Sequence, residues 1–269
     1  SEQIQTDYKN AGVMHVLAVS GMHIGIIYFL INLILKWFIR SENARFGIII
    51  AILCIFAVLS GLSGSVVRSV VMFLIIGLSV VFKRKTDSTH ALIASMFFIL
   101  IINPSYLFDV GFQLSYLAVF SIIYLYPLIR NVFTSKNIIL NYFLELIGIS
   151  LVAQIGILPL TIFYFGQVPL LFLIGNIIVV PLLTVVLFGL IALLLLNFIW
   201  KFAALYLGDF LSFLIEWVNH LIAIVASKED FVLNDIKMSL LQCVLSLVLI
   251  FLIAHVIKQF TFKKIFLVF

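Results

Sequence analysis

The chain is dominated by long apolar runs that short polar segments separate. An apolar run of about 20 residues lets an α-helix cross about 30 Å of hydrocarbon. The sequence predicts such spans at residues 13–35, 46–62, 65–82, 88–103, 111–127, 138–165, 168–199, 202–226 and 238–258. We therefore expect an all-α fold, a polytopic bundle of transmembrane helices.

Two of the predicted spans contain residues that disturb helices. Pro159 falls within 138–165, and Gly175 and Pro181 fall within 168–199. Proline removes a backbone donor, and in membrane proteins neighbouring helices re-satisfy the groups that it frees. We predict that these two segments are broken helices or re-entrant pairs arranged around the sequence FGQVP.

The segment 202–226 carries a polar stripe. Its members recur at spacings of 3, 4 and 3 and therefore share one face of a helix; they are Asp209, Ser212, Glu216 and Asn219. Such a helix either faces the bundle interior or lies flat in the membrane interface as an amphipathic helix. The sequence leaves both alternatives open.

The distribution of Lys and Arg bears on orientation, because cytoplasmic loops carry an excess of both. If all nine segments cross the membrane, twelve of the 16 basic residues fall on one side, which places the N-terminus outside and the C-terminus inside. If 202–226 lies flat, the division is eleven to five and the C-terminus is outside. The difference is too small to choose between the two topologies.

Composition excludes a soluble globular protein. Of the 269 residues 65% are hydrophobic and only 10% are charged, against about 25% charged residues in soluble domains. The net charge of +5 does not by itself indicate a surface that binds nucleic acid, because basic loops of a membrane protein produce the same value. Cys54 and Cys243 lie in apolar runs and indicate no disulfide framework. Neither GxxxxGK[ST] nor GxGxxG is present, so a nucleotide-driven motor has no support.

The C-terminal end of the sequence suggests a piece of a longer protein, and the N-terminal end is not a signal peptide. The opening residues, SEQIQTDYKNAG, lack the basic region of a signal peptide. At the other end, IFLVF (265–269) begins a new apolar run. We expect one transmembrane domain over residues 1–269, with IFLVF as the start of a further span.

Polar residues at membrane depth are costly and usually face a cavity or a partner. The first such group is HVLAVSGMH (15–23), in which His15 and His23 flank Ser20 and Gly21. The Ser-Gly pair predicts a helix interruption that opens backbone groups to a cavity. The alternative is that each histidine bonds a backbone carbonyl of a neighbouring helix. Two histidines without an HExxH pattern are too few to hold zinc, so we expect no metal and no cofactor.

A second group is SGLSGSVVRS (60–69), where small residues precede Arg68. Small residues let helices approach closely. Arg68 either snorkels to the interface or places a cation near the mouth of a pore, where a phosphate or carboxylate passes.

A third group is NPSYLFDVGFQLSYLAV (103–119). Asn-Pro predicts the end of one helix, and Asp109 is predicted to cap the N-terminus of the next. Gln113 lies one turn further in, where an uncharged amide could face a polar lumen.

A fourth group is the stretch 153–182, in which Gln154 and Asn176 stand among apolar residues and three prolines. Broken helices at membrane depth often mark binding or conduction sites. The predicted pore residues are therefore His15, Ser20, Gly21, His23, Arg68, Gln113, Gln154 and Asn176, and the predicted structural or helix-breaking residues are Asp109, Pro159 and Pro181.

Together these groups resemble a known family. HVLAVSGMH at 15–23, SVVRS at 65–69, DVGFQLSYLAV at 109–119 and AQIGILPL…FGQ…GNIIVVPL at 153–182 resemble the membrane "competence" domain of ComEC-type DNA-internalisation proteins. The resemblance covers roughly residues 11–185 and implies a multi-pass channel in the bacterial plasma membrane that passes one strand of transforming DNA inward. The predicted pore residues fall on the family's motif positions. We expect a weakly charged pore, in which weak binding permits movement.

The resemblance also implies domains and partners outside these residues. Family members commonly carry an OB-like domain before this region and a metallo-β-lactamase-like nuclease domain after it, so we do not expect this chain to be an enzyme. The implied partners are single-stranded DNA, the lipid bilayer, an extracellular DNA receptor, a cytoplasmic translocase and single-strand-binding proteins. The alternative function is a small-molecule secondary transporter built on broken helices, and an intramembrane metal hydrolase comes third.

Overall fold

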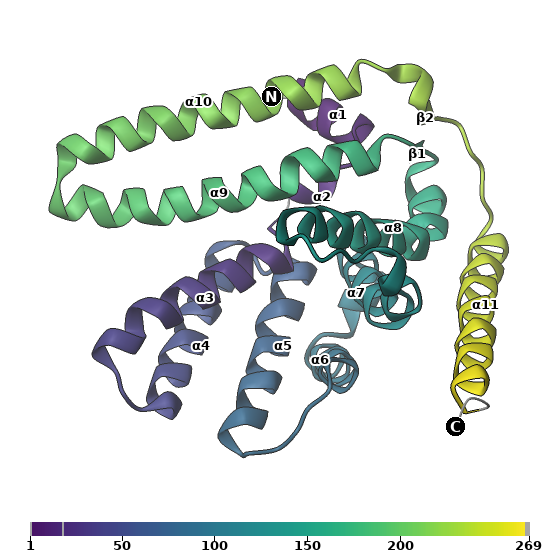
Figure 1. Ribbon diagram of the computed structural model, residues 1–269, viewed down its shortest axis with the longest axis horizontal. Helices are drawn as coiled ribbons and strands as arrows, with labels where there is room; N and C mark the ends of the chain where they lie inside the picture. The colour runs from purple at the N-terminus through teal and green to yellow at the C-terminus, as the bar shows by residue number, and fades with distance from the viewer. Residues whose placement is uncertain (1, 18, 267–269) are drawn as a thin grey trace. The chain divides into compact units, whose positions relative to one another are not determined.

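The computed structural model describes residues 2–17 and 19–266, and of these all side chains except those of residues 229 and 260–266. The described chain is almost entirely helical (Figure 1). Its α-helices are α1 (Glu2–Asn10), α2 (Met14–Leu17), α3 (Gly21–Phe38), α4 (Glu42–Leu59), α5 (Gly64–Val81), α6 (Ser88–Ile102), α7 (Val110–Ile129), α8 (Ile138–Phe165), α9 (Phe172–Ile199), α10 (Lys201–Ala226) and α11 (Leu240–Phe266). Short 3-10 turns are η1 (Pro104–Phe108), η2 (Arg130–Val132) and η3 (Glu229–Phe231). The predicted all-α fold is confirmed.

Within the described residues, eight helices are long and apolar enough to cross a membrane, and α6 is a shorter apolar helix. Eight of the nine predicted spans each correspond to one helix, and the span predicted at 13–35 is divided between α2 and α3. The chain is a multi-pass membrane protein. One boundary differs at the C-terminal end. Helix α11 continues to Phe266, so the first two residues of the predicted further span extend α11, and residues 267–269 lie outside the described residues.

The chain forms two compact units, each built from two stretches of sequence. Unit 1 comprises Ser1–Tyr106 and Pro169–Val232, and unit 2 comprises Leu107–Val168 and Leu233–Phe269. The short strands β1 (Val168–Pro169) and β2 (Val232–Leu233) pair with each other, and the chain passes from one unit to the other within each strand. The single transmembrane domain expected for residues 1–269 stays a prediction.

Each unit has buried apolar contacts between helices that are distant in sequence. In unit 1 the first cluster joins α3, α4 and α5 and contains Ile24, Ile49, Leu53, Ala57, Val66 and Val70. The second cluster joins α1 and its following loop to α9 and α10 and contains Tyr8, Ala11, Val13, Val179, Val218 and Ile222. In unit 2 a smaller cluster of Leu125, Val152 and Ala254 joins α7, α8 and α11.

Helix boundaries follow local capping chemistry. The carboxylate of Asp109 accepts a hydrogen bond from the backbone N–H of Phe112 at 2.6 Å, so its predicted role as the N-cap of α7 is confirmed. Asn137 caps α8 in the same way, through the N–H groups of Ile139 and Leu140. Helix α8 ends at Gly166, whose positive φ of 64° is a conformation that glycine adopts at little cost.

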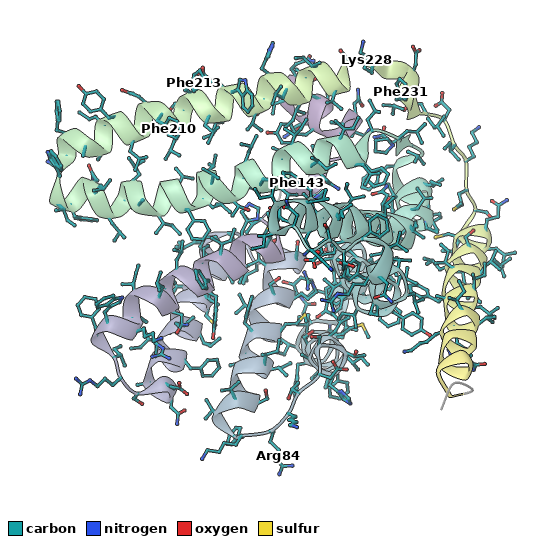
Figure 2. All side chains as sticks on the ribbon, viewed as in Figure 1. Arg84, Phe143, Phe210, Phe213, Lys228 and Phe231 are labelled. Atoms are coloured by element: carbon teal, nitrogen blue, oxygen red, sulfur yellow. The ribbon has the colours of Figure 1, made fainter. Side chains whose placement is uncertain are left out.

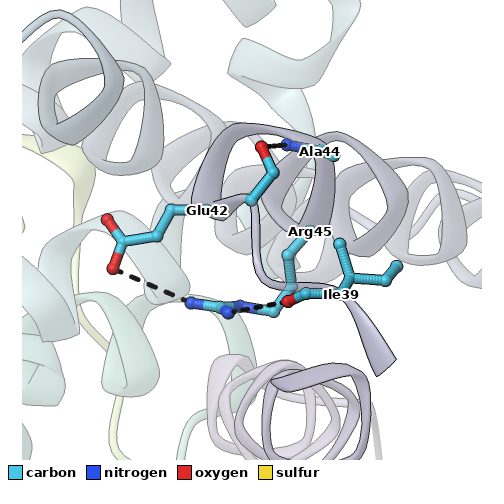
Figure 3. Close-up of polar contacts among 5 residues, drawn as sticks. Ile39, Glu42, Ala44 and Arg45 are labelled. Atoms are coloured by element: carbon cyan, nitrogen blue, oxygen red, sulfur yellow. Dashed lines mark hydrogen bonds and ion pairs between the residues drawn. The ribbon is translucent and has the colours of Figure 1, made fainter. Parts of the chain in front are cut away.

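The turn between α3 and α4 is held by polar contacts outside the apolar segments (Figure 3). Ser41 caps α4 by accepting from the N–H of Ala44 at 3.4 Å. Arg45 donates to the carbonyl of Ile39 at 3.3 Å and lies 4.0 Å from the carboxylate of Glu42. Arg45 therefore satisfies a carbonyl at the end of α3, which the helix itself leaves open.

The prediction that prolines break two helices is wrong. Helices α8 and α9 are each continuous over 28 residues, with Pro159 and Pro181 inside them, and Gly175 lies in the first turns of α9. Pro159 is buried inside α8, and a membrane helix tolerates a proline where neighbouring groups re-satisfy the backbone that it frees. The sequence FGQVP instead forms the connection between the two helices, where the αL residue Gly166 ends α8.

The polar stripe of α10 does not pack into unit 1. Asp209, Ser212 and Glu216 are exposed, and only Asn219 has a partner, since it accepts a hydrogen bond from the hydroxyl of Tyr8 on α1 at 2.8 Å. Figure 2 shows phenylalanine side chains projecting from the same helix, which are exposed as well. Helix α10 is long and apolar enough to cross a membrane, so its length does not require the flat arrangement.

A close approach between α7 and α8 gives a test of the packing in unit 2. A Cβ placed on Gly156 would collide with the side chain of Ser121. We expect Gly156→Ala to lower the free energy of unfolding by about 1–3 kcal/mol, because overpacking forces helices apart. Thermal unfolding of the purified protein in detergent measures this effect.

Two further variants make the test specific. Gly47→Ala is the matched control, since a Cβ there meets nothing within 4 Å. Adding Ser121→Gly to Gly156→Ala removes the colliding atoms and should restore the unfolding midpoint. An equal loss of stability in the Gly47 and Gly156 variants would contradict the proposed contact.

Candidate functional site

The predicted helix interruption at HVLAVSGMH is confirmed. Helix α2 ends at Leu17 and α3 begins at Gly21, with Ser20 in an extended conformation (φ −107°, ψ 170°). The backbone N–H of Ser20 donates to Nδ1 of His23 at 3.1 Å, and the Ser20 hydroxyl lies 2.8 Å from the same nitrogen. His23 thus bonds the start of its own helix, where the alternative interpretation had it bond a carbonyl of a neighbouring helix.

These contacts determine the protonation of the His23 ring. A backbone N–H can only donate, so Nδ1 of His23 must be an acceptor. The ring is therefore neutral and carries its proton on Nε2. The Nε2–H is left as an outward donor, for which the described residues offer no acceptor.

Arg68 lies beside this interruption. Its side chain is only 7% exposed, and its Nη1 donates to Sδ of Met72 at 3.4 Å. A Cβ on Gly21 would lie 3.1 Å from Nη2 of Arg68 and 2.8 Å from Oγ of Ser69. The interpretation that Arg68 snorkels to the interface is therefore wrong, because the guanidinium packs inside unit 1 against the first residue of α3.

This arrangement concentrates positive potential at one point. The first N–H groups of a helix lack intrahelical acceptors and carry the positive end of the helix dipole. In unit 1 the guanidinium of Arg68 lies against Gly21, the first residue of α3, and His23 stands two residues further along the same helix. Together these groups can attract an anion and donate hydrogen bonds to it.

His15 stands on the other side of the interruption, in α2 and outside the eight candidate spans. Its own surface is exposed, but the protein around it desolvates the ring. Desolvation lowers the pKa of His15, and a positive charge on His23 would lower it further. His15 is therefore neutral at physiological pH and adds hydrogen-bonding capacity without charge.

Asn176 occupies the first turns of α9 in unit 1. Its side chain is 8% exposed, and its Oδ1 is buried without a hydrogen-bond partner among the described residues. The preceding Gly175 packs closely against the carbonyl of Ala11 and the side chain of Val13, just before α2. Asn176 therefore lies on the helix that supports the chain leading into the interruption.

The two glutamines predicted for the pore lie in unit 2. Gln113 donates to the carbonyl of Leu107 at 2.8 Å and accepts from the hydroxyl of Tyr164 at 2.8 Å. Both ends of its amide are satisfied, so Gln113 joins α7 to α8. Gln154 is half-buried on α8, two residues before the close approach at Gly156.

The structure thus brings the sequence groups together in pairs. In unit 1, HVLAVSGMH meets SVVRS through Gly21, Arg68 and Ser69. In unit 2, DVGFQLSYLAV meets the first part of 153–182 through the bond between Gln113 and Tyr164. Sequence reasoning counted Ser69 only among the small residues that let helices approach closely, and it did not single out Tyr164, which lies within the stretch 153–182.

Metal chemistry has no visible basis in the described part of the chain. No group of three or more His, Cys, Asp or Glu side chains that could hold a metal ion occurs there.

Comparison with known proteins identifies the chain at the level of family. A model of the family described as "Competence protein" matches residues 1–260. The chain belongs to the competence protein family. ComE operon protein 3 of Bacillus subtilis (strain 168) is a relative with 32% identity over 233 residues, which are 86% of this chain and 29% of the relative. No solved structure matches.

Membership in the competence family covers the whole candidate site. The matched residues 1–260 include the start of α3, the Arg68 segment and the α7–α8 contacts. The chain spans only 29% of the length of ComE operon protein 3.

The contact between α3 and α5 predicts a specific sensitivity to a methyl group. Gly21→Ala should displace Arg68 and Ser69 and lower the unfolding midpoint, with a loss of about 1–3 kcal/mol. Gly25→Ala on the same helix is the control, since its Cβ would meet only Cζ of Phe73 at an ordinary 3.7 Å. Thermal unfolding in detergent compares the two variants, and equal midpoints would show that Gly21 is not a contact point.

Proposed function

We propose that this chain forms the membrane channel through which single-stranded DNA enters a bacterial cell during natural competence, and that it resides in the plasma membrane. Membership in the competence protein family supports the process. The arrangement of Arg68 and His23 at the start of α3 supports the substrate, because it offers donors for an anion inside a membrane-spanning unit. The observation that carries the proposal is the burial of the Arg68 guanidinium against Gly21.

A backbone phosphate of the strand is the anion that this site would meet. The Arg68 guanidinium is always charged and donates several hydrogen bonds to phosphate oxygens. His23 adds a neutral donor through Nε2–H. One full charge with neutral donors holds a phosphate weakly enough to release it, which a strand in motion requires.

Sequence-independent passage agrees with the same chemistry. The phosphate recurs at every nucleotide, so a site that binds phosphate does not distinguish bases. The neutral His15 and the amide of Asn176 add polar groups to unit 1 without adding net charge. We infer that this chain contributes passage rather than chemistry, and that the DNA receptor, translocase and single-strand-binding proteins expected from the sequence act on either side of it.

Substitution of Arg68 tests the proposed channel directly. In a naturally competent host carrying the full-length protein, Arg68→Gln should lower internalised labelled DNA by about tenfold, as expected for the loss of a charge-assisted hydrogen bond. DNA bound at the cell surface should not change. Arg84→Gln is the control, because Arg84 is exposed in the connection after α5 (Figure 2). Unchanged internalisation at normal protein level would remove Arg68 from the DNA path.

A pair of His23 variants separates the two roles of that ring. Asparagine places an oxygen where Nδ1 lies, so His23→Asn keeps the acceptor for Ser20 and loses the Nε2–H donor. We expect His23→Asn to retain the thermal stability of the wild type and to internalise less DNA. His23→Ala loses both functions and should also be less stable. Wild-type uptake in His23→Asn would mean that His23 serves only to cap α3.

A further inference from the structure

A second polar cluster lies in unit 2, between α7 and α11, and has no part in the site described above. The hydroxyl of Tyr124 lies 3.1 Å from Nδ1 of His255, and Nε2 of His255 lies 2.9 Å from Nε2 of Gln259. The ammonium of Lys258 lies over the ring of Tyr124, 5.1 Å from its centroid. Four polar side chains thus form one cluster where α7 and α11 contact each other.

Aromatic side chains pack next to this cluster at the contact between α7 and α11. Phe120 stacks on Tyr124 with ring centroids 5.8 Å apart, and Phe251 packs against both, at 5.0 Å and 6.0 Å. Phe120 contacts Phe251, and four residues further along both helices Tyr124 contacts His255. The two helices therefore run parallel. Their C-terminal ends therefore reach the same membrane surface.

The hydrogen bonds of the cluster have a direction. The amide nitrogen of Gln259 can only donate, so Nε2 of His255 accepts and the proton of the neutral ring lies on Nδ1. That Nδ1–H donates to the oxygen of Tyr124, which leaves the Tyr124 O–H free to donate elsewhere. Together with the ammonium of Lys258 and the second N–H of Gln259, the cluster presents three donors.

The position of the cluster along the membrane span determines which ligands it can contact. The sequence predicts the span of α11 at 238–258, and Lys258 is followed by two further basic residues, Lys263 and Lys264, so Lys258 and Gln259 lie where a membrane helix reaches the headgroup region. The residues preceding them, toward the membrane centre, are exposed and apolar; they are Leu252 (56% exposed), Ile253 (49%), Val256 (41%) and Ile257 (48%). Donors for an anion thus adjoin a surface that suits hydrocarbon chains.

We propose that the ends of α7 and α11 bind an anionic phospholipid. Its phosphate accepts from Lys258, Tyr124 and Gln259, and its acyl chains lie along the exposed apolar residues of α11. A nucleic-acid strand fits the cluster less well, because the rings of Phe120 and Tyr124 already stack on each other and the adjoining surface is apolar. This proposal does not depend on the proposed function.

Lipid binding to the purified protein provides the test. Native mass spectrometry of the detergent-solubilised protein, titrated with phosphatidylglycerol or with phosphatidylcholine of the same acyl chains, should show preferential retention of phosphatidylglycerol. Lys258→Gln should weaken phosphatidylglycerol binding by about fivefold, the effect of one basic residue near an anionic lipid. Tyr124→Phe keeps the aromatic packing and removes one donor, so it should weaken binding to a smaller extent.

Control variants and a competing ligand decide between the outcomes. Lys201→Gln removes an exposed basic residue at another helix end, the start of α10, and should leave binding unchanged. Equal retention of the two lipids by the wild type, or equal losses in the Lys201 and Lys258 variants, would overturn the proposal. If Lys258→Gln instead abolished binding of a fluorescent oligothymidine and left the lipid preference intact, the cluster would bind the DNA strand and the lipid proposal would be wrong.

Discussion

The burial of one guanidinium against the first residue of a helix is the interaction on which the candidate site depends. Moving a charged group away from water is costly, and the cost is tolerated when polar groups surround the charge. Arg68 is buried against Gly21 at the start of α3, beside the interruption between α2 and α3, and its Nη1 donates to Sδ of Met72. The interruption at Ser20 and the buried guanidinium of Arg68 therefore adjoin each other in unit 1.

Small side chains make this arrangement possible in both units. Gly21 lets α5 bring Arg68 and Ser69 to the start of α3, and Gly156 lets α7 bring Ser121 against α8. In membrane proteins water does not drive helices together, so close van der Waals packing across small residues carries more of the stability. The glycines at these helix contacts thus also bring polar side chains, Arg68 and Ser69 in unit 1 and Ser121 in unit 2, to the contacts.

The sequence predicted the helices and their order well, because length and apolar composition alone determine a membrane span. The cap at Asp109 and the interruption at Ser20 also followed from local chemistry. The prediction from the prolines was wrong, since Pro159 and Pro181 both lie inside continuous helices. Periodicity does not show which groups surround a proline in the folded protein. Contacts such as Gln113 with Tyr164, or Tyr124 with His255, join residues 51 and 131 positions apart, and no pattern in a single sequence indicates such pairs.

The uninterrupted length of α9 has a consequence for the surrounding bilayer. At 1.5 Å per residue, its 28 residues extend about 42 Å, and none of them is ionisable. Hydrocarbon is about 30 Å thick, so α9 meets it with a hydrophobic mismatch, which a tilt of about 45° would absorb. Any tilt short of that leaves apolar side chains to thicken the adjacent lipid. The thickness of the surrounding membrane therefore affects the tilt of α9 and the lipid next to it.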